Sequence, residues 1–280
     1  MREQAEQQLL ELGTSALPAL KEAAQADSAE VRFRARRIMA MVHRRLLDAS
    51  FERFAQQPDD VLDVEYGMWL VARLLNPDCQ REPLGLQLDE LADRVRALLP
   101  PDKLPREADP NVVVAAVRQV LFVEEGFTGN TANFDFPGNS SLETVLETKR
   151  GLPILLSLVV VAVGQRLDLP LVGIPTAGQF KVKYDGLHAP RGFPQSDIVL
   201  HPFEDGRILS VEEIKKQSGG VDPAIYLKPA EPRATMVRIL ANLISHLAAH
   251  GQDAKAERAF AYRALLEAHA GRSRESLPFP

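Results

Sequence analysis

The sequence contains one cysteine, Cys79, among 280 residues, and it has no long uninterrupted apolar run. A single cysteine cannot form an intrachain disulfide, so a disulfide-stapled secreted scaffold is excluded and a reducing compartment is compatible. The longest apolar stretch, residues 152–163, is interrupted by Ser157 and is too short to span a bilayer. The charged N-terminus predicts no signal peptide. These features predict a cytoplasmic protein with no membrane partner.

The sequence also has no excess of positive charge, because acidic residues outnumber basic ones and the formal net charge is -5. No basic face extends over a domain, which argues against a nucleic-acid partner. The arginines at 32–37 and 44–45 lie among acidic residues on helical patterns, so we expect a solvated face. Only His246 and His250 share a helical i, i+4 spacing, without a His-Glu-x-x-His motif, so no metal site is predicted. No glycine-rich segment continues as Gly-Lys-Ser/Thr, so we expect no phosphate loop and no cofactor.

Helical patterns dominate the first half of the chain. Residues 1–48 predict three helices, and the string "LGTSALPALKEAAQADSAEVRFRARRIM" resembles a HEAT repeat, although a plain helical cap on the main domain explains it equally well. Residues 50–125 continue with three more helical patterns, and Trp69 and Phe122 are interpreted as core residues. From 216 a linker-like stretch leads to two further helices, and the final residues, from 272, are expected to be loose.

The helical pattern ends at residues 128–141, where Gly, Asn and Pro residues predict a structured loop. A helix is expected from about Pro153 to Leu167, with Pro153 at its start, where its missing N–H costs nothing. This helix is apolar nearly all round, which places it at the centre of a domain. Four strand patterns follow, with Asp205-Gly206 as the turn between the last two. A buried helix on an antiparallel sheet predicts an α+β fold.

The stretches "NTANFDFPGNSSLETVLETKRGLPILLSL", "RLDLPLVGIPTAGQF" and "VLHPFEDGRILS" resemble the SirB family of transglutaminase-like proteins. The tail from "PRATMVRILANL" through "AAHGQDAKAERAF" is similar to the tetratricopeptide-like hairpin that often follows that domain. The resemblance implies a transglutaminase-like, or papain-like, core. It divides the chain into a HEAT-like segment at 1–48, a SirB-type domain at 49–215 and a tetratricopeptide-like hairpin with its tail at 216–280.

A catalytic member of such a fold needs a thiolate at the start of the buried helix, a histidine on the adjacent strand and an Asp or Asn on the next. Here the helix starts with Pro153 and Ile154 and holds no nucleophile. The family's Pro-Gly-His-Phe turn is Ala-Gly-Gln-Phe, with Gln179 in the histidine position, and its Asp-Pro-Phe string begins with His201. We refer to Pro153, Ile154, Gln179 and His201 as the relic positions. Gln179 cannot act as a general base, because an amide is not basic near neutral pH.

Other polar residues offer weaker candidates for a site. We expect His201 to hydrogen-bond to Gln179 across adjacent strands, and Ser157 to bond back to a carbonyl rather than to act as a nucleophile. Cys79 is interpreted as an incidental surface thiol, and His188 as an exposed loop residue. The residues expected to bind a ligand, should the relic cleft have kept that role, are Asn133, Asp135, Asn139 and Phe180.

Three functions remain open on the sequence alone. The first is a non-catalytic, protein-binding or regulatory scaffold that contacts another protein through its helical modules. The second is a peptide or small-molecule sensor that uses the relic cleft. The third is a hydrolase with an unrecognised constellation around His201, Gln179 and Asp135. The partner and the oligomeric state are not readable from the residues.

Overall fold

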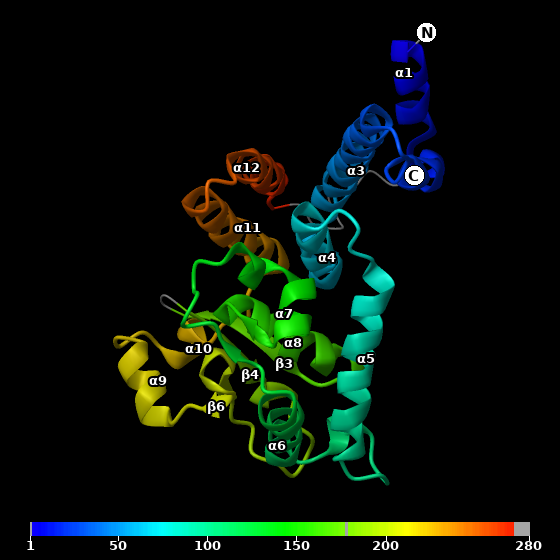
Figure 1. Cartoon of the computed structure of the whole chain (residues 1–280). Helices are drawn as coiled ribbons and strands as arrows, with labels where there is room; N and C mark the ends of the chain where they lie inside the picture. The colour runs from blue at the N-terminus through cyan, green and yellow to red at the C-terminus, as the bar shows by residue number, and fades with distance from the viewer. Residues whose placement is uncertain (1, 177–178, 272–280) are drawn as a thin grey trace, which may run out of the picture.

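The computed structural model describes residues 2–176 and 179–271, so Ala177 and Gly178 of the Ala-Gly-Gln-Phe turn and the tail from residue 272 lie outside the described residues. The chain forms an elongated molecule in which a central sheet and its helices carry a helical extension at one end (Figure 1). Within the described residues, no helix is both long and apolar enough to cross a membrane.

The helical extension contains its own small core. Ser28 begins the long third helix, and its side chain accepts a hydrogen bond from the Val31 N–H. The first part of that helix packs with the two helices before it in a cluster that is separate from the main core. Its second part, including Phe51 and Phe54, belongs to the main core. The predicted boundary between residues 48 and 49 therefore falls within one continuous helix. The elements are α1 (Arg2–Leu12), α2 (Leu17–Ala23) and α3 (Ala29–Ala55).

Three helical segments lead from this extension to the central domain. Asp63 and Asp109 cap two of them by accepting hydrogen bonds from the Tyr66 and Asn111 N–H groups. The predicted third helix continues beyond Arg118 as a wider π-helical turn that contains buried Phe122, as the core interpretation predicted. The three segments are α4 (Val64–Leu75), α5 (Arg81–Ala97) and α6 (Pro110–Arg118), the last continued by the π-helix η4 (Gln119–Glu124).

The central helix confirms the sequence prediction closely. It begins at Pro153 in the first helical position, and nearly every side chain along it is buried because helices and strands surround it. The short helix before it starts with Ser141, whose hydroxyl accepts from the Thr144 N–H. The elements are α7 (Leu142–Thr148) and α8 (Pro153–Arg166), joined through a two-stranded parallel pairing of β1 (Thr128–Gly129) with β2 (Arg150–Gly151).

A four-stranded antiparallel sheet packs against α8, which confirms the α+β expectation. Asp205 and Gly206 both have left-handed backbone angles, and the Gly206 N–H bonds to the His201 carbonyl, so the predicted turn is confirmed. The last strand is shorter than the strand pattern suggested, because Ser210 caps a new helix. The strands, in their spatial order, are β3 (Leu171–Thr176), β4 (Gln179–Tyr184), β5 (Ile198–His201) and β6 (Arg207–Ile208).

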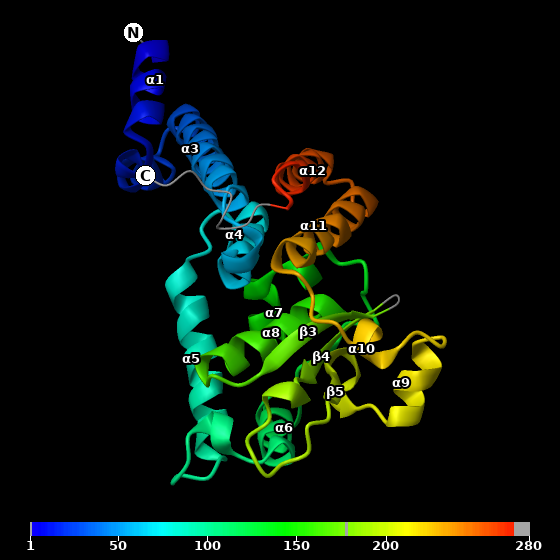
Figure 2. The same ribbon diagram turned by 180° about the vertical axis from the view of Figure 1, so that it is seen from behind.

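The other face of the sheet is also covered, which the sequence did not indicate. The stretch from 210 to 227 forms α9 (Val211–Gln217) and α10 (Pro223–Tyr226) rather than only a linker, and both lie beside the sheet (Figure 2). Their neighbourhood supplies a second small apolar cluster with strand residues Ile174 and Val199. As a result, Ile174 and Val199 are buried although they lie on the face of the sheet turned away from α8.

The two C-terminal helices form the expected hairpin. They are α11 (Pro232–Ala249) and α12 (Asp253–Ala268), and they pack against each other, α11 also on α4 and α12 also on α3. The Tyr262 ring of α12 stacks on Phe51 of α3 at 3.9 Å between centroids. This contact joins the C-terminal hairpin to α3, and α12 lies beside that helix (Figure 1).

Candidate functional site

The start of α8 is the place where a catalytic member of this architecture would hold its thiolate. Leu152 and Ile154 are each 1% exposed, and the Leu152 N–H donates to the Asn139 carbonyl at 3.2 Å. Pro153 has no N–H to offer. The first turn of α8 therefore lacks a nucleophile and is closed by apolar side chains and by the preceding loop.

Asn139 holds that loop in place. It is 1% exposed, and its amide nitrogen donates to the carbonyls of Asn133 (2.7 Å) and Phe134 (3.1 Å). Its amide oxygen accepts from the side chain of Asn130 at 2.9 Å. Both the nitrogen and the oxygen of the Asn139 side-chain amide are therefore hydrogen-bonded to residues of the loop, and these bonds hold the loop in its conformation. Asn133 and Asp135 are exposed on the same loop.

Aromatic rings lie between this loop and the end of β5. Phe134 makes an edge contact with Phe203 and another with His246, both at 6.0 Å between ring centroids. A side chain at Gly129 would collide with the Phe203 ring, whose nearest atom would lie 2.5 Å from the added Cβ. The Phe203 ring therefore packs directly on the backbone of β1. Gly129 of β1 pairs in turn with Gly151 of β2, the segment that precedes α8.

Gln179 and His201 are brought together as the sequence predicted. His201 Nε2 lies 2.8 Å from Gln179 Oε1, and since an amide oxygen only accepts, the ring must donate from Nε2. Burial lowers the pKa of His201, and the Glu204 carboxylate opposes this effect, with its Oε1 3.5 Å from Nε2. The neutral ring then carries its lone pair on Nδ1, which is buried and has no hydrogen-bond partner in the described part of the chain. This arrangement orients the His201 ring, and the ring acts only as a hydrogen-bond donor toward Gln179.

A buried lysine next to this pair was missed by the sequence reasoning. Lys181 is 2% exposed, and its amine donates to the Thr176 hydroxyl at 2.7 Å. The β4–β5 register, in which Val182 pairs with Leu200, places Lys181 opposite His201 on the same side of the sheet. Burial lowers the pKa of Lys181 to about 8. The alternation along β4 could have shown that Lys181 faces away from α8, but not that α9 and α10 cover that side.

The remaining sequence candidates are scattered. Ser157 donates to the Phe180 carbonyl at 3.2 Å, so its hydroxyl bonds to a carbonyl, although to one on β4 rather than on its own helix. Phe180 is itself 1% exposed and belongs to the core. His188 is exposed, with Nδ1 3.2 Å from an Asp185 oxygen. The prediction of a surface thiol is wrong, because Cys79 is 4% exposed and burial raises its pKa to about 12.

The cavities described below lie away from the relic positions. An apolar cavity of about 180 Å³ lies between α4, α8, β3 and the start of α11, with Phe180 in its wall. Two larger surface hollows involve the helical extension. Among these cavities of the described residues, none is lined by Pro153, Gln179 or His201. The described residues contain no group of three or more His, Cys, Asp or Glu side chains arranged to hold a metal ion.

Comparison with known proteins places this geometry in a family. A UPF0162 protein of Xylella fastidiosa is 36% identical over 144 residues, which cover 47% of this chain and 48% of that protein. A UPF0162 protein of Pseudomonas aeruginosa is 28% identical over 70% of this chain and 67% of its own length. Human F-box only protein 21 is 21% identical over 76% of this chain and 37% of that protein.

The matched region thus spans about half the length of the Xylella relative. No solved structure matches the chain. The model of the transglutaminase-like superfamily matches residues 83–241, more than half of the sequence, from within α5 into α11. The buried helix α8, its antiparallel sheet and the relic positions all lie inside this match. The chain belongs to the transglutaminase-like superfamily.

Proposed function

We propose that this protein is a non-catalytic, SirB-type member of its superfamily that acts as a protein-binding or regulatory scaffold. The observation that carries the proposal is the contact between Gln179 and His201, at 2.8 Å, in the strands where catalysis would need a histidine and a carboxylate. The hydrogen bond from His201 to an amide oxygen fixes the ring and leaves its lone pair on buried Nδ1, to which no hydroxyl or thiol of the described residues hydrogen-bonds. Together with Pro153 at the helix start, it leaves a folded core without the reacting groups.

Binding through the helical ends is supported by the hollow between α3 and α12, which we call the α3–α12 groove. Its volume is about 730 Å³. Arg44, Asp48 and Glu52 line it from α3, and Glu257 and Arg258 line it from α12. Charges of both signs around a floor that includes alanines and Leu265 suit a polar, complementary protein surface. We assign the partner to this groove, between the HEAT-like segment and the tetratricopeptide-like hairpin.

The test is affinity capture with the full chain as bait, followed by identification of the proteins retained and by binding of the purified candidate. Arg258→Glu reverses a charge in the groove, whereas Arg263→Glu reverses a charge on the same helix outside it, where Arg263 pairs with Glu267. We expect Arg258→Glu to release the partner and Arg263→Glu to retain it, with both variants unfolding at temperatures close to that of the parent chain. Equal retention by both variants would place the partner elsewhere.

The sensor and hydrolase alternatives predict other outcomes of the same experiment. His201→Ala, combined with Gln179→Ala, removes the hydrogen-bonded pair without touching the groove. A scaffold that uses its helical ends keeps its partner after this double change. Loss of the partner, or of a saturable thermal shift with a peptide, would instead favour a ligand-binding role for the relic positions.

A further inference from the structure

A second surface hollow, which we call the Trp69 pocket, lies where the helical extension meets the central domain. Its volume is about 510 Å³. α2 contributes Pro18 and Lys21 to its wall, α3 contributes His43, and α4 contributes Trp69 and Arg73. The Trp69 pocket is remote in sequence from the relic positions, and it belongs to no part of the proposed scaffold groove.

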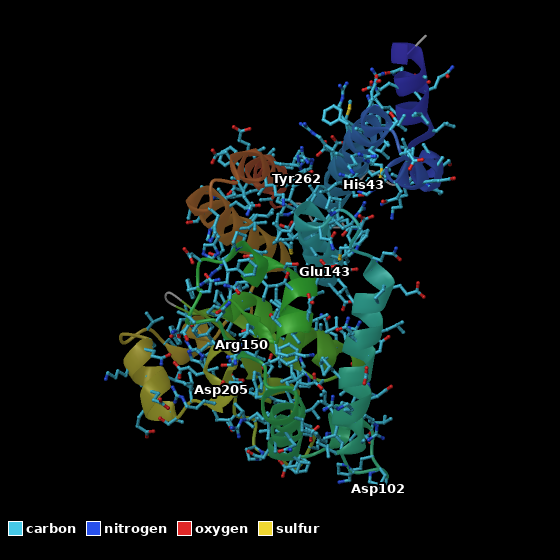
Figure 3. The ribbon with its side chains drawn as sticks, viewed as in Figure 1. His43, Asp102, Glu143, Arg150, Asp205 and Tyr262 are labelled. Carbon is cyan, nitrogen blue, oxygen red and sulfur yellow. The ribbon has the colours of Figure 1, made fainter. Side chains whose placement is uncertain are left out.

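His43 is buried in the wall of this pocket without a hydrogen-bond partner. It is 8% exposed, and no hydrogen bond to either ring nitrogen forms within residues 2–176 and 179–271. Figure 3 shows His43 on α3 above the junction with α4. Neither ring nitrogen is among the fully buried polar atoms without a partner, so both keep contact with solvent and can be reached by a ligand in the pocket. Its position in the pocket wall makes a bound ligand the natural partner.

Arg73 supplies a positive charge that is not neutralised by a neighbour. Its guanidinium lies over the Trp69 ring at 5.1 Å from the centroid, and within the described chain it forms no ion pair. The other two cations of the pocket are paired, because Lys21 contacts Asp78 at 2.9 Å and Arg81 contacts Asp63 at 3.0 Å. The pocket therefore carries one uncompensated positive charge beside an aromatic wall.

We infer that the Trp69 pocket binds a carboxylate carried on an apolar body, with Arg73 as its cationic partner and His43 as a second donor. A guanidinium presents paired N–H groups that match the two oxygens of a carboxylate. The Trp69 ring and Pro18 provide the apolar contact for the rest of the ligand. Arg73 offers a single unpaired charge, so a monoanionic carboxylate fits the site better than a doubly charged phosphate.

The charge state of His43 gives the site a defined pH dependence. Burial lowers the pKa of His43, and of the charged groups that face it, Asp78 raises this pKa while Arg73 and Lys21 lower it. A bound carboxylate raises the pKa of His43 because it stabilises the protonated ring. Binding is therefore expected to tighten as the pH falls below neutrality, as long as the ligand remains ionised.

The only tryptophan of the chain lies in this pocket, so its fluorescence reports binding directly. The full chain is titrated with N-acetyl-leucyl-phenylalanine, which carries a free terminal carboxylate, and with the same compound as its C-terminal amide. A third probe, N-acetyl-leucyl-glutamate with an amidated C-terminus, carries its carboxylate on a side chain. Inorganic phosphate is included as the competing anion.

Arg73→Gln removes the charge and keeps most of the side-chain length, and Arg45→Gln makes the same change at an exposed position of α3 outside the pocket. We expect saturable binding of the acid in the millimolar range or tighter, at least about tenfold weaker for the amide and for Arg73→Gln, and unchanged for Arg45→Gln. Comparison of the affinities of the two acids then shows whether the pocket prefers a terminal carboxylate or a side-chain carboxylate. Equal binding of acid and amide, full affinity in Arg73→Gln, preference for phosphate, or no saturable response up to about 10 mM would overturn the proposal.

Discussion

Replacing Lys181 by methionine should stabilise the protein near neutral pH. Lys181 is 2% exposed, its amine donates a hydrogen bond to the Thr176 hydroxyl, and burial lowers the pKa of the amine from 10.5 to about 8. At 1.36 kcal/mol per pKa unit, this shift corresponds to a penalty of about 3 kcal/mol for holding the charged amine in the folded state. Loss of the hydrogen bond to Thr176 offsets about 1 kcal/mol. The expected net gain in the free energy of unfolding is about 2 kcal/mol.

The same pKa shift fixes the pH dependence of this gain. Below pH 8 the amine is charged in both states, so the penalty is fully present. Between about pH 8 and pH 10.5 the unfolded chain keeps the proton that the folded chain has released, so the parent protein gains stability as the pH rises. The advantage of Lys181→Met should therefore shrink across this interval. Urea unfolding followed by circular dichroism at about pH 7 and about pH 10 measures both values.

Lys183 provides the matched control, because it lies on the same strand and is also buried. Its amine is paired with Asp197 at 3.0 Å and with Asp185 at 3.5 Å. Lys183→Met leaves these carboxylates without their cation, so we expect a loss of about 3 kcal/mol instead of a gain. A loss of stability in Lys181→Met at neutral pH, or a gain that does not shrink at high pH, would refute the reasoning.

Three further predictions concern single residues. Cys79, whose pKa burial raises to about 12, should resist a thiol reagent in the folded protein and react only after unfolding; rapid labelling of the native chain would contradict its burial. Gly206→Ala should cost more than about 1 kcal/mol in thermal unfolding, because Gly206 has φ +65 and an added Cβ would lie 2.2 Å from the Phe122 ring; a neutral result would exclude that contact. Tyr262→Phe should cost about 1 to 2 kcal/mol in urea unfolding by removing the 2.5 Å bond to Asp48, and no change would show that this bond is not formed in solution.

The central helix could be predicted from the sequence because local signals determine it, whereas the relic positions were assigned through the resemblance to the SirB family. Pro153 marks the first turn of α8, and the apolar residues on nearly every side of that helix require burial all round. The pairing of Gln179 with His201 followed from two adjacent strand patterns whose ends must meet. The turn at Asp205-Gly206 followed from the backbone angles that these residues tolerate.

The burial of Lys181, Cys79 and His43 could not be predicted from local sequence signals, because it depends on segments that are distant in the chain. Lys181 is covered because residues 210–227 fold into α9 and α10, and this stretch looked like a strand followed by a linker. Cys79 lies in a Pro- and Asp-containing connection of the kind that is usually exposed, yet it packs in the main core, and Glu143 of α7 contributes to raising its pKa. His43 stands next to exposed arginines on α3, and its burial arises from packing at the junction with the central domain.

The most direct test of the central claim is an amide-exchange and hydrolysis assay on the full chain. The purified protein is incubated with a glutamine-containing protein substrate and a fluorescent primary amine, and in parallel with a panel of peptides. A core that holds Pro153, Gln179 and His201 at the relic positions predicts no product above the protein-free background. Turnover that persists in Cys79→Ser and disappears in His201→Ala would contradict the account and establish an enzyme.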